Sequence, residues 1–318
     1  MTQQLVKLTN VSQRLKDALN NIIVGQEMVV DQLLIALLAE GHVLMEGVPG
    51  TAKTLLAKTL ARLISVDFAR VQLTPDMMPS DIIGTSVYDL NSRTFHVKKG
   101  PIFTGLLLAD EINRTPPKTQ SALLEAMEEH QVTLDGQTHV LPEPFMVIAT
   151  QNPIEFEGTY PLPEAQLDRF MLKILVSYPG KEAETNILRK WQSGDYKRYA
   201  TELEPLISRE EILECRQQLR TVQVEDSIFT YLSELIDKTR SISDLYLGAS
   251  PRAAINWLAA AKAQAALAGR DFVTPDEIKM TAAPILRHRL ILTPEAEMEG
   301  ISIKQVIDNL LNQVKVPR

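Results

Sequence analysis

The chain has 318 residues, enough for about two domains, and an ordinary apolar fraction that supports a sizeable core. Its net charge is −7 and its Lys and Arg residues form no run, which disfavours stable nucleic-acid binding because such binding needs a concentrated positive surface. The single cysteine, Cys215, excludes a disulfide within the chain, and the absence of a signal-peptide pattern or a membrane-length apolar run predicts a cytoplasmic location with no membrane span.

The first part of the chain alternates between helical and extended patterns. Helical periodicity appears at 10–21, behind a possible cap at Asn10 or Ser12, and again at about 27–41. Short aliphatic runs, bounded by Gly, Pro or polar residues, then recur at 42–46, 67–73, 105–110, 145–150 and 171–176. Helical stretches lie between several of them, so we predict a doubly wound parallel sheet flanked by helices.

Two hairpins interrupt this alternation, and the pattern changes after Gly180. The first hairpin spans 85–98 around Asn91-Ser92, and the second spans 132–141 around the tight-turn pair Asp135-Gly136. Each is either a surface decoration or a working loop. The remainder is helical, with capping-box patterns at 208–211 and 274–277. We therefore place an α/β core at 1–180, a linker at 181–205 and a smaller all-helical lid at 206–318.

A glycine-rich stretch, GVPGTAKT, follows the strand predicted at 42–46 and precedes a helical pattern. This is the context of a phosphate-binding loop, whose backbone N–H groups and following helix N-terminus favour an anion. Lys53 would reach the β- and γ-phosphates, and the Thr54 hydroxyl would bind Mg²⁺. The predicted nucleotide-binding residues of this segment are Gly47, Val48, Pro49, Gly50, Thr51, Ala52, Lys53, Thr54 and Leu55.

Ala52 departs from the usual loop pattern, which has glycine before the lysine. An L-residue is acceptable at this point if its φ is negative, since the cost of a Cβ is severe mainly at positive φ. We therefore expect a negative φ at Ala52 and a loop that still binds nucleotide. The alternative is an ordinary Gly-Pro turn.

Polar residues end two of the predicted strands. Asp110 and Glu111 follow four apolar residues, and a neighbouring parallel strand should bring them beside the loop. Asp110 would hold Mg²⁺ through water, and Glu111 would orient the attacking water, which favours an NTPase over a kinase. Asn152 follows another strand and can place an amide at the γ-phosphate. The alternative for the acidic pair is a solvated strand end.

The segments GVPGTAKT, LLLADEINR, VIATQNP, LPEAQLDRF and GASPRA occur in an order that resembles the AAA+ ATPases, and specifically the MoxR family. The resemblance covers nearly the whole chain. It implies a P-loop NTPase core followed by a helical lid, with ATP and Mg²⁺ as cofactors and ATP hydrolysis as the reaction.

The resemblance also implies roles for single residues. Asn152 matches the sensor 1 position, Arg169 the arginine finger that enters a neighbouring subunit's site, and Arg252 the sensor 2 position in the lid. Ile23 and Val24 match the segment that packs on adenine. For Arg169 the alternative is an ion pair with Asp168 or Glu164. The hairpins match the helix 2 insert of this branch and the hairpin before sensor 1.

The implied function is a remodelling chaperone that matures or activates partner complexes, including metal-cofactor insertion. Relatives suggest a homo-oligomeric ring, a hexamer, working with a separate protein that carries a von Willebrand factor A domain. Two alternatives remain: an ATPase subunit of the magnesium chelatase type, and a nucleotide-dependent scaffold with little hydrolysis. A DNA-acting motor is disfavoured by the acidic balance of the chain.

Overall fold

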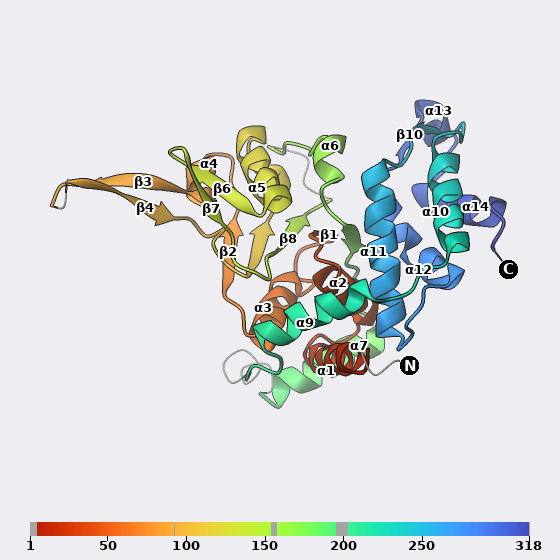
Figure 1. Ribbon diagram of the computed structural model, residues 1–318, viewed down its shortest axis with the longest axis horizontal. Coiled ribbons are helices and arrows are strands. Elements are labelled where there is room, and N and C mark those ends of the chain that lie inside the picture. The colour runs from red at the N-terminus through yellow and green to blue at the C-terminus, as the bar shows by residue number, and fades with distance from the viewer. Residues whose placement is uncertain (1–4, 92, 154–157, 195–202, 318) are drawn as a thin grey trace.

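The computed structural model describes residues 5–91, 93–153, 158–194 and 203–317, and Figure 1 shows their arrangement. The chain opens with two helices, α1 (Val6–Ile22) and α2 (Glu27–Leu38). The predicted caps at Asn10 and Ser12 are wrong, because α1 begins before both of them. Leu5 and Leu8 are buried, so the apolar face of α1 extends back beyond the segment in which we recognised it.

The five apolar runs form one parallel sheet, as predicted. Its strands are β1 (Val43–Glu46), β2 (Phe68–Gln72), β5 (Leu106–Asp110), β8 (Met146–Gln151) and β9 (Leu172–Leu175). They lie in the order β2-β5-β8-β1-β9, and every pair is parallel. The strand that ends in Asp110 is therefore not the direct neighbour of β1, because β8 lies between them.

Both faces of the sheet are covered by helices. Side chains alternate along each strand, so Leu44 and Leu107 join the core formed with α5 (Pro117–Glu129). Val43 and Leu108 join the opposite core, which contains α1, α2 and α3 (Lys53–Leu63). All parallel strands end at the same edge of the sheet, which gathers the polar residues that follow β1, β5 and β8.

Both predicted hairpins are present. The first consists of β3 (Gly84–Asp89) and β4 (Thr94–Lys99), follows the short helix α4 (Pro79–Ile83) and projects from the body of the molecule (Figure 1). Ser92, in its predicted turn, lies outside the described residues. The second consists of β6 (Gln131–Leu134) and β7 (Gln137–Val140), and Asp135 and Gly136 have positive φ values of 48° and 79°, typical of a tight hairpin turn.

The C-terminal part is helical. Its helices are α7 (Lys181–Gln192), which falls within the predicted linker, α9 (Arg209–Arg220), α10 (Asp226–Thr239), α11 (Pro251–Leu267), α12 (Pro275–Leu286), α13 (Pro294–Met298) and α14 (Ile303–Gln313). A two-stranded pair, β10 (Leu245–Leu247) with β11 (Ile291–Leu292), is the departure from an all-helical lid. Both capping boxes are confirmed.

The lid packs on the N-terminal helices, since α11 contacts both α1 and α2. Buried residues of α9, α10, α11 and α12 belong to the same apolar core as α1, α2 and α3. Among the described residues, no helix has both the length and the apolar character that crossing a membrane requires.

Candidate functional site

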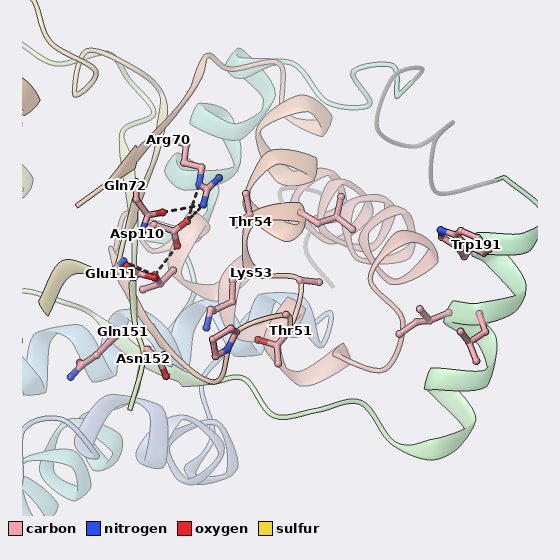
Figure 2. A pocket seen from close by; sticks show the side chains of 17 residues that line it. Thr51, Lys53, Thr54, Arg70, Gln72, Asp110, Glu111, Gln151, Asn152 and Trp191 are labelled. Atoms are coloured by element: carbon pink, nitrogen blue, oxygen red, sulfur yellow. Dashed lines mark hydrogen bonds and ion pairs between the residues drawn. The ribbon is translucent and has the colours of Figure 1, made fainter. Parts of the chain in front are cut away.

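A cavity of about 930 Å³ lies where the predicted phosphate loop meets the carboxyl ends of the strands (Figure 2). Its lining includes Pro49–Leu55 from the loop and α3, Asp110 and Glu111 at the end of β5, and Thr150–Asn152 at the end of β8. Arg70 and Gln72 enter it from β2, and Ile187, Leu188 and Trp191 enter it from α7. One cavity therefore contains most of the residues that the sequence proposed for nucleotide binding.

The small residues of the loop occupy positions with different structural requirements. A Cβ at Gly47 would lie 2.3 Å from the Val176 carbonyl oxygen, so close backbone approach requires glycine. Gly50 has open space but a φ of +82°. The predicted negative φ at Ala52 is wrong: its φ is 63° and ψ is 18°, in the left-handed region. The chain turns sharply there to start α3, so the alanine carries a strain of roughly 1–2 kcal/mol that glycine would avoid.

Lys53 and Thr54 form the first turn of α3, where the positive end of the helix faces the cavity. Lys53 Nζ donates to the Gly47 carbonyl and, at 3.1 Å, to the Val48 carbonyl. Burial lowers the pKa of Lys53, while the nearby Asp110 and Glu111 carboxylates act to raise it. Gly47 and Val48 thus contact the lysine, although they are not among the residues that line the cavity.

The acidic pair lies in a hydrogen-bonded network. Asp110 Oδ1 accepts from Thr150 Oγ1 at 2.8 Å, and that hydroxyl accepts from the Glu111 backbone N–H at 2.9 Å. Glu111 has a φ of 59°, a strained value for a residue with a side chain, and its carboxylate pairs with Arg114 at 3.0 Å. Strain of this kind concentrates at functional sites, and here it re-aims the chain directly after β5.

The donor set fits Mg²⁺. This ion commonly binds through one or two carboxylates together with substrate phosphates and water. The Thr54 hydroxyl and the Asp110 carboxylate line the same cavity as the loop, so both place hard oxygen atoms where a triphosphate would lie. When bound there, the ion would neutralise charge on the phosphate oxygens.

Ile23 and Val24 lie beside the loop. Together with Ile22 they line a small cavity of about 50 Å³, which they share with Gly50–Ala52, Leu55 and Ile187. Several of these residues also line the large cavity, so the two hollows adjoin. Asn152, 8% exposed, lines the large cavity from the end of β8.

Arg169 and Arg252 lie outside the large cavity. Neither occurs among the described residues that line the large cavity. Both contact one carboxylate, that of Glu128 on α5: Arg169 Nη2 lies 3.2 Å from Oε2, and Arg252 Nη2 donates to Oε1. Arg169 thus forms an ion pair, as the alternative expected, but the partner that the structure shows is Glu128. Asp168 binds Arg289 at 2.6 Å and Ser250 at 2.8 Å.

This Arg169–Glu128–Arg252 cluster, called the arginine cluster below, lies at the amino edge of the sheet. Arg169 precedes β9, and the residue before β1, His42, binds the Met127 carbonyl next to Glu128 at 3.0 Å. The phosphate loop follows β1 and so lies at the carboxyl edge. The length of the strands therefore separates the arginine cluster from the cavity of its own chain.

Sequence reasoning missed several residues that contact the site. Arg70 and Gln72 alternate along β2, and Thr150 directly precedes the predicted Gln151-Asn152 end; strand-end polarity could have indicated all three. Trp191 carried no signal, because an exposed aromatic on an amphipathic helix has many explanations. Glu128 carried none either, since only the fold brings α5 beside Arg169 and Arg252.

Comparison with known proteins agrees with this geometry. Residues 42–172 match the ATPase family associated with various cellular activities (AAA), and residues 237–310 match the AAA lid domain. The fold is thus that of the AAA+ ATPases.

Full-length similarity narrows the class. "Chaperone MoxR1" of Mycobacterium tuberculosis is 43% identical over 93% of this chain and 80% of its own length. "Uncharacterized protein YeaC" of Bacillus subtilis is 47% identical over 94% of this chain and 92% of its own. A crystal structure of a protein from Cytophaga hutchinsonii aligns with a TM-score of 0.92 and 44% identity, covering 99% of this chain and 98% of that one. The chain belongs to the MoxR family of AAA+ ATPases.

Proposed function

We propose that this protein binds Mg²⁺·ATP in the large cavity and hydrolyses it. The observation that carries the proposal is the convergence of Lys53, Thr54, Asp110, Glu111 and Asn152 on one cavity at the carboxyl edge of the sheet. Family membership supports ATP as the substrate. Ile23 and Val24, beside the loop, supply an apolar contact for the base.

Each residue of the cavity has a distinct task. The loop N–H groups and Lys53 bind the phosphates, while Thr54 and Asp110 hold the metal. Glu111 orients and polarises the attacking water, and the Asn152 amide positions it against the γ-phosphate. Glu111 must exchange its contact with Arg114 for the water, which its partial exposure permits.

The arginine cluster completes the site of a neighbouring subunit. Arg169 cannot reach the cavity of its own chain across the sheet, and Arg252 shares its carboxylate partner Glu128. A head-to-tail contact would bring one subunit's amino edge to the next subunit's cavity, and repetition of such a contact closes a ring. We propose a ring, a hexamer, in which both guanidinium groups neutralise phosphoryl charge in trans.

The work performed is remodelling of a partner protein. Support comes from the name chaperone of the 43% identical relative, which also favours a MoxR-type role over a magnesium chelatase subunit. We propose maturation or activation of partner complexes, including metal-cofactor insertion, together with a separate protein that carries a von Willebrand factor A domain. The Glu111→Gln variant, loaded with ATP, should retain such a partner, and the same variant loaded with ADP should release it.

The test of the site is nucleotide binding and phosphate release. Lys53→Ala should weaken Mg²⁺·ATP binding by ~10², the size expected for loss of one charged hydrogen-bonding group. Lys58→Ala is the matched control, because Lys58 lies exposed on the same helix. Equal affinity in the wild type and Lys53→Ala, or no phosphate release from the wild type at any protein concentration, would overturn the proposal.

A further inference from the structure

Both oxygens of the Asp110 carboxylate are engaged by the protein. Oδ1 accepts the Thr150 hydroxyl at 2.8 Å. Oδ2 accepts two N–H groups of Arg70, from Nε at 2.8 Å and from Nη2 at 2.7 Å. The guanidinium therefore holds, with two donors, the oxygen that the Thr150 hydroxyl leaves available.

Arg70 reaches Asp110 from the neighbouring strand. In the register of β2 and β5, Arg70 lies opposite Leu108 and Gln72 lies opposite Asp110, so the three polar side chains project from the same face of the sheet. Figure 2 shows the guanidinium beside the Asp110 carboxylate. The Arg70 side chain is 48% exposed and lines the same cavity as Lys53 and Thr54, so it has room to move.

The guanidinium has a second anchor in the cavity. Its Nη2 also donates to Gln72 Oε1 at 3.2 Å. Gln72 is neutral, so this contact survives when a positive charge approaches the carboxylate. Arg70 can therefore leave Asp110 without losing every partner.

We propose that Arg70 competes with the divalent cation for Asp110 Oδ2 and so sets the metal affinity of the nucleotide site. A guanidinium is positive at all physiological pH values, and a divalent cation at the same oxygen is repelled by it. Entry of the cation with its nucleotide displaces Arg70 toward Gln72. This inference rests on the proposed nucleotide site and deepens it.

A merely orienting role for Arg70 predicts the opposite sign. If the guanidinium served only to aim the carboxylate at the metal, its removal would weaken metal binding. Competition predicts that its removal strengthens metal binding, because Asp110 keeps the Thr150 contact and regains a free oxygen. The sign of one affinity change thus separates the two roles.

The experiment measures Mn²⁺ binding by electron paramagnetic resonance of the free ion, at saturating ADP. Arg70→Gln should bind Mn²⁺ roughly tenfold more tightly than the wild type, because one unit of opposing charge is gone. Arg70→Lys keeps the charge but donates from a single nitrogen. Its Mn²⁺ affinity should lie between those of the wild type and Arg70→Gln. Arg220→Gln is the control, since Arg220 is 76% exposed and pairs with Glu40 outside the cavity. Affinity for ADP in excess chelator should stay unchanged in Arg220→Gln.

Unchanged or weaker Mn²⁺ binding in Arg70→Gln overturns the inference and leaves the proposed function intact. Should Arg70→Gln fail to fold, Arg70→Lys decides, because affinity equal to or below the wild type overturns the inference equally. Failure of the wild type to bind Mn²⁺ with ADP at all would overturn both the inference and the proposed function.

Discussion

The nucleotide cavity and the arginine cluster are built in contrasting ways. The cavity gathers residues that directly follow parallel strands, so the sheet itself brings Lys53, Asp110 and Asn152 to one edge. The arginine cluster brings Arg169, which precedes β9, and Arg252 of α11 to Glu128 of α5, at the other edge. The cavity is lined by residues of one chain, and the arginine cluster holds its guanidinium groups outside that cavity.

The two regions lie at opposite edges of one sheet. The lid is fixed to the amino edge near Arg169 by a buried arginine, Arg289, which binds the Asp168 carboxylate at 2.6 Å and the Met171 carbonyl at 3.0 Å. Burial lowers the pKa of Arg289, and Asp168 acts to raise it. Arg289 therefore holds the lid against the core beside the arginine cluster.

Removing the Arg169 guanidinium group should have the largest effect. Arg169→Ala is expected to lower ATP turnover by ~10³, at the low end of the range for an arginine supplied in trans to some GTPases. Nucleotide affinity should stay unchanged, because Arg169 does not line the cavity of its own chain. Arg252→Ala should give a smaller loss of the same kind. The measurements are phosphate release and equilibrium binding of a fluorescent nucleotide.

Arg220→Ala is the control for both arginines, since it removes an exposed guanidinium outside the cluster. A large loss of nucleotide affinity in Arg169→Ala would place this residue in its own cavity and remove the contrast between the two regions.

Removing the Glu111 carboxylate should have the next largest effect. Glu111→Gln is expected to slow hydrolysis by ~10² or more, since positioned acid–base groups contribute about that much, and to retain ATP. Glu299→Gln, exposed near the C-terminus, is the control. Turnover that matched the wild type would make Glu111 a solvated strand end, the alternative that its sequence position left open.

A buried histidine, His42, links the sheet to the helix that carries Glu128, and this link is pH-dependent. Its Nδ1 accepts from the Val147 N–H at 2.9 Å and its other nitrogen contacts the Met127 carbonyl, so the neutral ring joins β8 to the end of α5. Burial lowers the pKa of His42 from 6.5 to about 4. The fold favours the neutral ring. The stabilisation that His42 contributes to the fold is therefore fully present above pH 6.5 and is lost as pH falls toward 4.

The full loss should reach about 3 kcal/mol in the free energy of unfolding, a factor of ~10² in the folding constant. Urea unfolding between pH 7.5 and 4 would measure this loss. His96→Asn in the exposed hairpin should keep the pH dependence of the free energy of unfolding, and His42→Asn should reduce it. An NMR titration that gave His42 an ordinary pKa would contradict the account.

Changing Ala52 should have the smallest effect. Glycine relieves the left-handed strain but costs about 0.5–1 kcal/mol in chain entropy, so Ala52→Gly should bind nucleotide within about threefold of the wild type. Ala52→Val, β-branched at φ 63°, should lose more than tenfold. Titration with a fluorescent ADP analogue measures both. Equal binding by glycine and valine would mean that the loop relaxes away from the observed backbone.

The cavity was largely predictable from sequence, because its residues follow apolar runs at fixed spacing. Lys53, Asp110 and Asn152 each come directly after a strand or loop that local pattern reveals. The φ of Ala52 was not, since a single residue's backbone depends on the turn that surrounds it. Glu128 was not predictable either, because its contacts join α5 to Arg169 and to Arg252 in the lid, and no local pattern reports a contact of 124 residues' separation.

The most direct test of the shared site is a mixture of two inactive variants. Glu111→Gln keeps Arg169, and Arg169→Ala keeps Glu111, so neighbours of different kind can form one complete site between them. Equal amounts, assembled at random in a ring, should regain about a quarter of wild-type turnover, because one interface in four then has both groups. A mixture no more active than its two components would show that each subunit hydrolyses ATP alone, and would contradict the account.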